Sequence, residues 1–162
     1  MSGLLIRRAA PNDAVYARTI RCLALSESPT AYGTRLDEVV SRPLRYWRML
    51  IRQRPWFLAF DENDVVGMVT TDTYGFNGET YPGVYGMYVA PHFRGTAVAP
   101  SLLNEVKTFN ASRGHQRLFL DVVLGNDRAE HFYRREGFDR IGEVRSLDRD
   151  PRRFMTAMVC DL

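Results

Sequence analysis

The chain has 162 residues, which is enough for one compact domain with a buried core. Its composition, 45% hydrophobic and 25% charged, is typical of a globular protein, and its longest apolar runs are too short to span a membrane. The net charge of +3 suits an anionic ligand but is too small to indicate nucleic-acid binding. We expect a single domain over residues 1–162, and a cytoplasmic location because the N-terminus lacks the pattern of a signal peptide.

The first half of the chain predicts a strand, two helical regions and three more strands. Residues 11–13 open the first helix, and residues 61–64 form the turn of a hairpin. Pro43 leaves the start of the second helix open, because proline is tolerated only in a first helical turn. The expected elements are a strand at 4–8, a helix after 11–13, a helical region within 36–53, strands at 56–60 and 65–74, a loop at 75–83 and a strand at 84–89.

The second half predicts two helices, each ended by a glycine, and three strands. The expected elements are a helix at about 99–113, a strand at 118–123, a helix at 126–136 and strands at 138–144 and 154–160. Consecutive strands favour antiparallel hairpins, whereas the strand–helix–strand unit over 84–123 favours a parallel pair with a right-handed crossover. The order β-α-α-β-β-β-α-β-α-β-β therefore predicts an α/β (α+β) fold, with a mixed, mostly antiparallel sheet of about seven strands flanked on both faces by about four helices.

The cysteines and histidines indicate neither a disulfide framework nor a metal site. Cys22 and Cys160 show no C-x-x-C spacing, so we expect buried free thiols. The three histidines show no metal-ligand spacing with cysteines or carboxylates, so we expect no metal.

The stretch from residue 84 to 103 has the features of a phosphate-binding turn. A strand ends at Pro91, a short loop with Arg94 and small residues follows, and an amphipathic helix begins. Small residues let the unpaired N–H groups of a first helical turn approach a ligand, and the helix dipole favours its negative charge. This turn is therefore a candidate site for a pyrophosphate.

A second informative stretch covers residues 118–138. Asn126 is a natural N-cap for the helix that follows it. Ala129 and Tyr133 are four residues apart and therefore share one face of that helix.

Together the two stretches resemble the GNAT N-acetyltransferase family. The family's second motif is matched at every position, by Asn126, Ala129, Tyr133, Gly137 and Phe138. Its first motif is matched by Val89, Pro91, Arg94 and Ala99, and Gly95 completes the common Arg-Gly pair. The predicted order of strands and helices is also that of the family, so the resemblance covers most of the chain.

The resemblance implies an acetyl-CoA-dependent enzyme that transfers acetyl directly to an amine, either of a small molecule or of a peptide or protein N-terminus. Tyr133 would be the general acid that protonates the departing CoA thiolate, and Asn126 would hydrogen-bond the cofactor. A core position is the competing interpretation of Tyr133. Homodimers are common in the family, and we expect neither nucleic acid nor membrane as a partner.

The resemblance also assigns cofactor contacts to two main-chain segments. The strand segment would pair with the pantetheine arm and polarise the thioester carbonyl, as an oxyanion hole does. The loop would bind the pyrophosphate on its amides. The strand residues are Met87, Tyr88 and Val89, and the loop residues are Arg94, Gly95, Thr96, Ala97, Val98, Ala99 and Ser101.

The loop departs from the family pattern at two positions. Ala97 replaces the usual first glycine, and Pro100 removes one N–H donor. Pro100 is well tolerated if it lies in the first helical turn. The other interpretation is weakened or lost cofactor binding, which raises a second hypothesis, a non-catalytic acyl-CoA-binding or regulatory module.

The acceptor requires a base, because a lysine-like amine with a pKa of roughly 10.4 is charged at neutral pH. Asp121 lies five residues before Asn126, where the ribosomal-protein N-terminal acetyltransferases of the family carry a glutamate. The resemblance therefore makes Asp121 the leading candidate. An ion pair with Arg117 or Arg128 is the equally supported alternative. Glu79 and Glu27 are weaker candidates, with surface roles as the competing interpretation.

Overall fold

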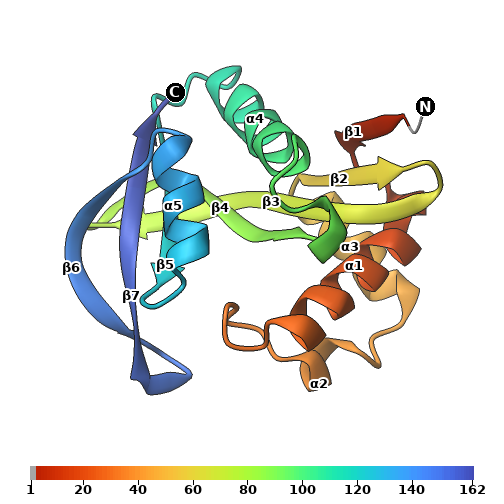
Figure 1. The fold of residues 1–162 in the computed structure, drawn as a ribbon, viewed down its shortest axis with the longest axis horizontal. Coiled ribbons are helices and arrows are strands. Elements are labelled where there is room, and N and C mark those ends of the chain that lie inside the picture. Colours follow the sequence, from red (N-terminus) through yellow and green to blue (C-terminus); the bar gives the residue numbers. More distant parts are fainter. Residues whose placement is uncertain (1–2) are drawn as a thin grey trace. The chain divides into compact units, whose positions relative to one another are not determined.

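The computed structural model describes residues 3–162, and these form seven strands and five α-helices (Figure 1). The strands make one mixed sheet in the order β1-β2-β3-β4-β5-β7-β6, which confirms the predicted fold class. The strands are β1 (Leu4–Arg8), β2 (Trp56–Asp61), β3 (Asp64–Phe76), β4 (Glu79–Val89), β5 (Arg117–Val123), β6 (Asp139–Leu147) and β7 (Asp150–Asp161). The helices are α1 (Ala14–Glu27), α2 (Leu36–Val39), α3 (Leu44–Gln53), α4 (Val98–Ala111) and α5 (Asp127–Arg135), with 3₁₀ turns η1 (Pro11–Asp13) and η2 (Pro91–Phe93).

The expected parallel pair is present between β4 and β5, where Gly83 is the partner of Phe119. Helix α4 is the crossover that connects these two strands, as a parallel connection requires. The β1–β2, β2–β3, β5–β7 and β6–β7 pairs are antiparallel. No helix in the described part of the chain is long and apolar enough to cross a membrane.

The prediction of a loop over residues 75–83 is wrong, because β3 and β4 are joined by a tight two-residue turn. Asn77 and Gly78 both have positive φ, +51° and +78°. This conformation is that of a type I′ hairpin turn, for which Asn-Gly is the preferred sequence. Glu79, expected in a loop, is therefore the first residue of β4.

The second helical region is two helices rather than one, which raises the number of helices above the expected four. Helix α2 is a single turn, and α3 begins at Leu44. Pro43 has extended dihedral angles, φ −69° and ψ 160°, and is the N-cap residue of α3. A proline at this position needs no helical N–H, whereas inside a continuous helix it would break the hydrogen-bond ladder.

The contacts between residues divide the chain into two compact units. The first unit comprises the chain up to Asp72 together with Tyr85–Val106, and the second comprises Thr73–Val84 and Lys107–Leu162. Strands β3 and β4 contribute residues to both units. The single domain over residues 1–162 stays a prediction.

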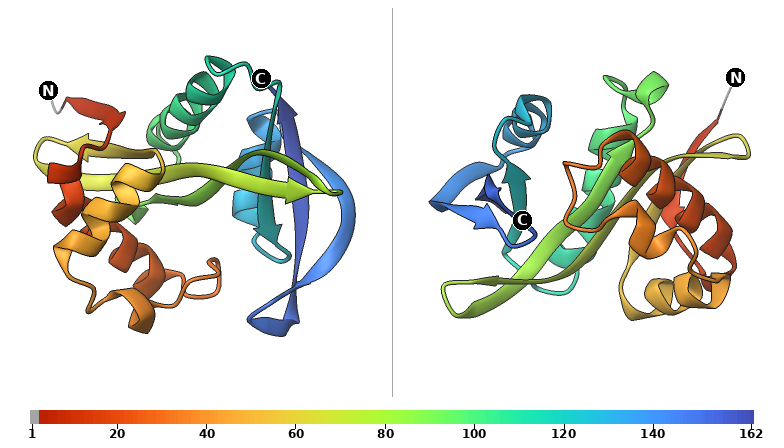
Figure 2. Two further views of the ribbon diagram at one scale, coloured as in Figure 1. Left: turned by 180° about the vertical axis from the view of Figure 1, so that it is seen from behind. Right: turned by 90° about the horizontal axis from the view of Figure 1, so that it is seen from below.

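Helices cover both faces of the strands in the first unit (Figure 2). Met68 on β3 packs in a core cluster with α1 and α3 residues such as Ile20 and Trp47. Its neighbour Gly67 faces α4, since a Cβ built there would lie 2.9 Å from Cδ1 of Leu102. Successive strand residues point to opposite faces, so α1 and α3 lie on one face of these strands and α4 lies on the other.

The second unit has an aromatic cluster on one face of β5. The Phe119 ring stacks with Tyr74 at 5.4 Å between centroids and lies 4.4 Å from Tyr81. The fully buried side chains of Leu118 and Leu120 alternate with Phe119 and therefore point to the other face. By the same alternation Asp121 shares the face of the aromatic cluster.

Candidate active site

The loop before α4 presents its main chain to solvent. Gly95 has a φ of +74°, a conformation that favours glycine, and a Cβ built on it would have no neighbour within 4 Å. Gly95, Thr96 and Ala97 are all exposed. The Thr96 hydroxyl donates to the carbonyl of Phe93 at 2.6 Å and accepts from the Val98 N–H at 3.3 Å, which ties the loop to the start of the helix. An exposed backbone at a helix N-terminus fits a phosphate group.

Pro100 is the third residue of α4 and lies in its first turn. The Ser101 N–H donates to the carbonyl of Ala97 at 3.0 Å. Residues before Ser101 have no acceptor within the helix, because an α-helical N–H bonds the fourth preceding carbonyl. Pro100 therefore leaves the helical ladder intact, as the first of the two interpretations requires.

The Arg94 side chain joins the end of β4 to the end of α1. Its Nε donates to the carbonyl of Val89 at 2.9 Å, and its Nη2 forms an ion pair with Glu27. The Tyr88 hydroxyl donates to the same carboxylate. Burial, reinforced by this hydrogen bond, raises the pKa of the Tyr88 hydroxyl. Glu27 is thus a polar link between three elements of the first unit.

The carbonyls of β4 around Gly86 are held by side chains from other elements. Gly86 has a φ of +60°, which kinks the strand. The Tyr32 hydroxyl donates to the Met87 carbonyl at 2.9 Å, and the Thr70 hydroxyl donates to the Tyr85 carbonyl at 3.3 Å. These contacts fix the orientation of the strand at the position assigned to the thioester. No local motif marks Tyr32 or Thr70, because they are distant from β4 in the sequence.

Asn126 caps α5, as predicted. Its Oδ1 accepts from the Ala129 N–H at 3.3 Å, and the helix begins at the next residue, Asp127. The Tyr133 ring on this helix is buried, 8% exposed, and lies edge-on to Phe138 with 5.7 Å between centroids. Its ring therefore belongs to the packed interior of the second unit, which holds the phenol in one orientation.

Asp121 lies in a polar cluster on the face of the aromatic rings. It accepts a hydrogen bond from the Tyr74 hydroxyl at 2.7 Å and forms an ion pair with Arg145 on β6. Its arginine partner is thus Arg145, neither Arg117 nor Arg128. Burial and the hydrogen bond to Asp121 raise the pKa of Tyr74 well above its usual range.

The remaining candidates lie elsewhere on the molecule. Glu79 accepts from the Tyr81 hydroxyl in the second unit, where Arg117 also lies against the Tyr81 ring. Cys22 and Cys160 are free thiols, as expected, but only Cys160 is buried, whereas Cys22 is half-buried. Burial raises the pKa of Cys160 to about 11. Among the described residues, no group of three or more His, Cys, Asp or Glu side chains could hold a metal ion.

The motif residues lie within a segment that matches a known family model. The model of the acetyltransferase (GNAT) family matches residues 19–138. The chain belongs to the GNAT acetyltransferase family. No curated protein sequence matches this GNAT chain.

Solved structures with the same fold include acetyltransferases of distant sequence. A GNAT acetyltransferase from Streptococcus pneumoniae is 19% identical with a TM-score of 0.78, covering 99% of this chain and 100% of its own. A ribosomal-protein-alanine N-acetyltransferase from Brucella melitensis is 20% identical with a TM-score of 0.80, and the match covers 98% of this chain and 99% of that protein. A putative acetyltransferase from Salmonella typhimurium, solved with its cofactor acetyl-CoA, is 16% identical with a TM-score of 0.80. The match covers 99% of this chain and 95% of that protein.

Proposed function

We propose that this GNAT protein is an acetyl-CoA-dependent N-acetyltransferase that transfers acetyl directly to an amine acceptor. The observation that carries the proposal is the exposed loop of residues 95–97 immediately before α4, within the segment that matches the family. Acetyl-CoA supplies an activated thioester when bound. The proposal places the reaction in a single domain in the cytoplasm, and a homodimer is the oligomer it favours.

The loop binds the cofactor pyrophosphate through its amides in this proposal. Thr96, Ala97 and Ala99 contribute main-chain N–H groups that point away from the helical ladder. The proposed set is Arg94, Gly95, Thr96, Ala97, Val98, Ala99 and Ser101. Because Arg94 is engaged by Glu27 and Val89, its first role is to position the loop rather than to neutralise phosphate charge.

The β4 segment Met87–Val89 binds the pantetheine arm and polarises the thioester carbonyl with main-chain N–H groups. Tyr133 donates its proton to the departing CoA sulfur. Asn126 uses its amide oxygen for the helix cap, so its NH₂ group is the part of the side chain that donates to the cofactor.

Asp121 accepts the proton of the acceptor ammonium, directly or through water. Tyr74 and Arg145 position its carboxylate by a hydrogen bond and an ion pair. A purely structural ion pair with Arg145 is the competing role. The two roles differ in what they predict for the rate and for the stability of an Asp121 variant.

The names of the structural neighbours do not select one acceptor. They include a ribosomal-protein-alanine N-acetyltransferase, a putative phosphinothricin N-acetyltransferase and a nourseothricin acetyltransferase. Those names describe one protein acceptor and two small molecules, so they are compatible with both acceptor classes.

Release of free thiol from acetyl-CoA tests the proposal, with peptides, polyamines, aminoglycosides and amino acids as acceptors. We expect at least one acceptor class to give turnover that requires both substrates. Thermal shift with CoA is the companion measurement, because a ligand of the native state must raise its stability. Stabilisation by CoA without acetylation of any amine would favour the non-catalytic module, and no stabilisation would contradict cofactor binding altogether.

A further inference from the structure

Arg21 on α1 is a half-buried cation, and no carboxylate among the described residues acts on its pKa. Its Nη1 is buried and has no hydrogen-bond partner among the residues that the structure describes. Its guanidinium carbon lies 4.9 Å from the centroid of the Tyr32 ring. Loss of hydration lowers the pKa of Arg21, as burial does for a cation, and no carboxylate offsets this effect.

An unpaired buried charge is unfavourable for folding. Removing a guanidinium from water is costly unless an anion and hydrogen bonds replace its hydration. A perturbed, unpaired group of this kind is more typical of a ligand site than of a structural core. Arg21 is half-buried as a residue, so part of it is accessible to solvent.

The unpaired nitrogen lies against the kink of β4. A Cβ built on Gly86 would be 3.4 Å from Nη1 of Arg21. The Tyr32 ring that stacks on Arg21 also carries the hydroxyl that donates to the Met87 carbonyl. Arg21 is thus adjacent to the strand segment that the proposed function assigns to the acetyl thioester.

The position of Arg21 separates it from the proposed pyrophosphate loop. The Cβ position on Gly86 is near both Arg21 and Met68, so Arg21 lies on the face of the strands covered by α1 and α3. The helix that follows the loop, α4, packs on the opposite face, against Gly67. Phosphate groups bound at the N-terminus of α4 would therefore not contact Arg21, so its anion must be a different group.

The charges near Arg21 also favour an anion. Arg54 is close enough to lower the pKa of Arg21 further, and its own partner is Asp72 at 3.1 Å. The Arg54–Asp72 ion pair carries no net charge, so Arg21 leaves a net positive charge beside the kink. A carboxylate is the anion that matches the planar fork of a guanidinium in a bidentate contact.

We infer that Arg21 binds a carboxylate carried by the acceptor amine, so that the acceptor is an amino acid or a related small amino carboxylate. This inference rests on the proposed function and narrows its acceptor class. A protein N-terminus has no carboxylate beside its amine, so the inference favours a small molecule over a protein acceptor.

Matched acceptors test this inference. Each of the common L-amino acids is compared with its amide, which keeps the amine and the side chain and removes the negative charge. We expect kcat/KM for the best amino acid to exceed that for its amide by tenfold or more, mainly through a lower KM. In Arg21→Met the ratio of the two kcat/KM values should fall to about one.

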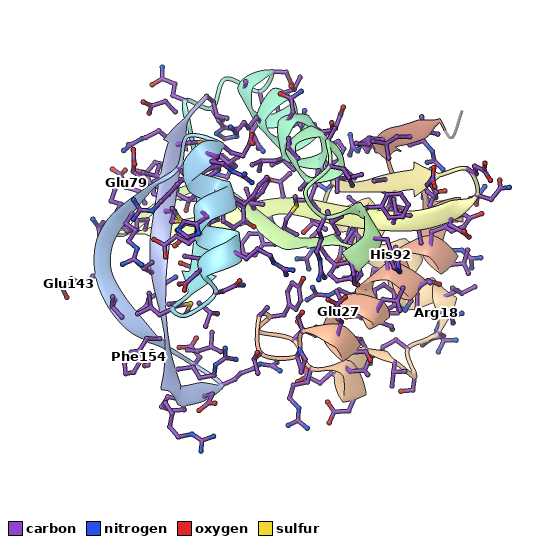
Figure 3. All side chains as sticks on the ribbon, viewed as in Figure 1. Arg18, Glu27, Glu79, His92, Glu143 and Phe154 are labelled. Carbon is purple, nitrogen blue, oxygen red and sulfur yellow. The ribbon has the colours of Figure 1, made fainter. Side chains whose placement is uncertain are left out.

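Arg18→Met is the control, because Arg18 lies one turn earlier on the same helix (Figure 3). It should retain the preference for the carboxylate. The melting temperature of Arg21→Met should equal or exceed that of the parent, since the substitution removes an unpaired charge. Equal rates for acids and amides in the parent, or a preference that survives in Arg21→Met, would overturn the inference.

A binding measurement separates this inference from the proposed function. Amino acids and their N-acetyl derivatives are added with saturating CoA, and the melting temperature is followed. We expect a saturable rise in the parent and in Arg18→Met, with none in Arg21→Met. Such a rise without turnover would contradict the proposed transfer reaction but support the carboxylate site, whereas no rise with any carboxylate would overturn the site.

Discussion

The two groups of predicted site residues are held in different ways. In the first unit the proposed functional groups are main-chain atoms, and Tyr32, Thr70 and Arg94 donate to carbonyls of β4 from outside the strand. In the second unit they are side chains, and Tyr133 and Asp121 are fixed by ring packing and by hydrogen bonds. Binding by main-chain atoms tolerates a substitution that leaves the backbone conformation unchanged. Catalysis by a side chain is lost when one of its functional atoms is removed.

The largest effect is expected at Tyr133. Tyr133→Phe keeps the ring that packs against Phe138 and removes only the proton donor, so kcat should fall by about 10²–10⁴-fold. Steady-state rates measure this, and a thermal shift with CoA should be unchanged. Tyr16→Phe, a half-buried ring in the first unit, is the control. Parent-like turnover of Tyr133→Phe would leave Tyr133 with a core role alone.

A smaller loss is expected for Asp121→Asn, about 10²-fold in kcat/KM at neutral pH. The missing base makes the reaction depend on amine that is already deprotonated, so the variant should recover activity as the pH rises toward the pKa of the acceptor. A pH–rate profile against the parent measures this recovery.

The competing structural role predicts another result for Asp121→Asn. Loss of the ion pair with Arg145 would lower the melting temperature and leave the pH profile unchanged. Tyr74→Phe sharpens the distinction, because it keeps the ring stacked on Phe119 and removes one hydrogen bond to the carboxylate. A rate loss in Tyr74→Phe smaller than that of Asp121→Asn would support positioning.

In the main-chain site the sensitive position is Gly95. Alanine at its φ of +74° costs about 1–2 kcal/mol, so the loop should relax from this conformation. We expect the dissociation constant for acetyl-CoA to rise about tenfold, measured by calorimetry, with kcat at saturation little changed. Unchanged affinity would mean that the loop does not bind in the conformation described.

The smallest effects are expected for Ala97→Gly and Pro100→Ala. Both restore features of the family pattern, yet Pro100 already lies where the helix needs no N–H. Each should change the affinity for acetyl-CoA by less than about threefold, equivalent to about 0.7 kcal/mol. A tightening of tenfold or more by either one would support the other interpretation, that these residues impair cofactor binding.

The amino-acid sequence by itself determined the order of the elements, the cap at Asn126 and the family. These depend on signals that act over a few residues: side-chain periodicity, helix caps and turn residues. One local signal was misread, and another left a helix boundary open. Asn77-Gly78 specified a tight turn where we predicted a loop, and Pro43 specified the boundary between two helices.

Only the tertiary structure decided which partners the polar side chains take. Tyr74 and Asp121 are 47 residues apart, and Arg94 and Glu27 are 67 apart. Such pairs depend on strand register and helix packing, which bring distant residues together without any local pattern. The same reason hides Arg21, since only the folded chain shows that its Nη1 is buried beside β4 without a hydrogen-bond partner among the described residues.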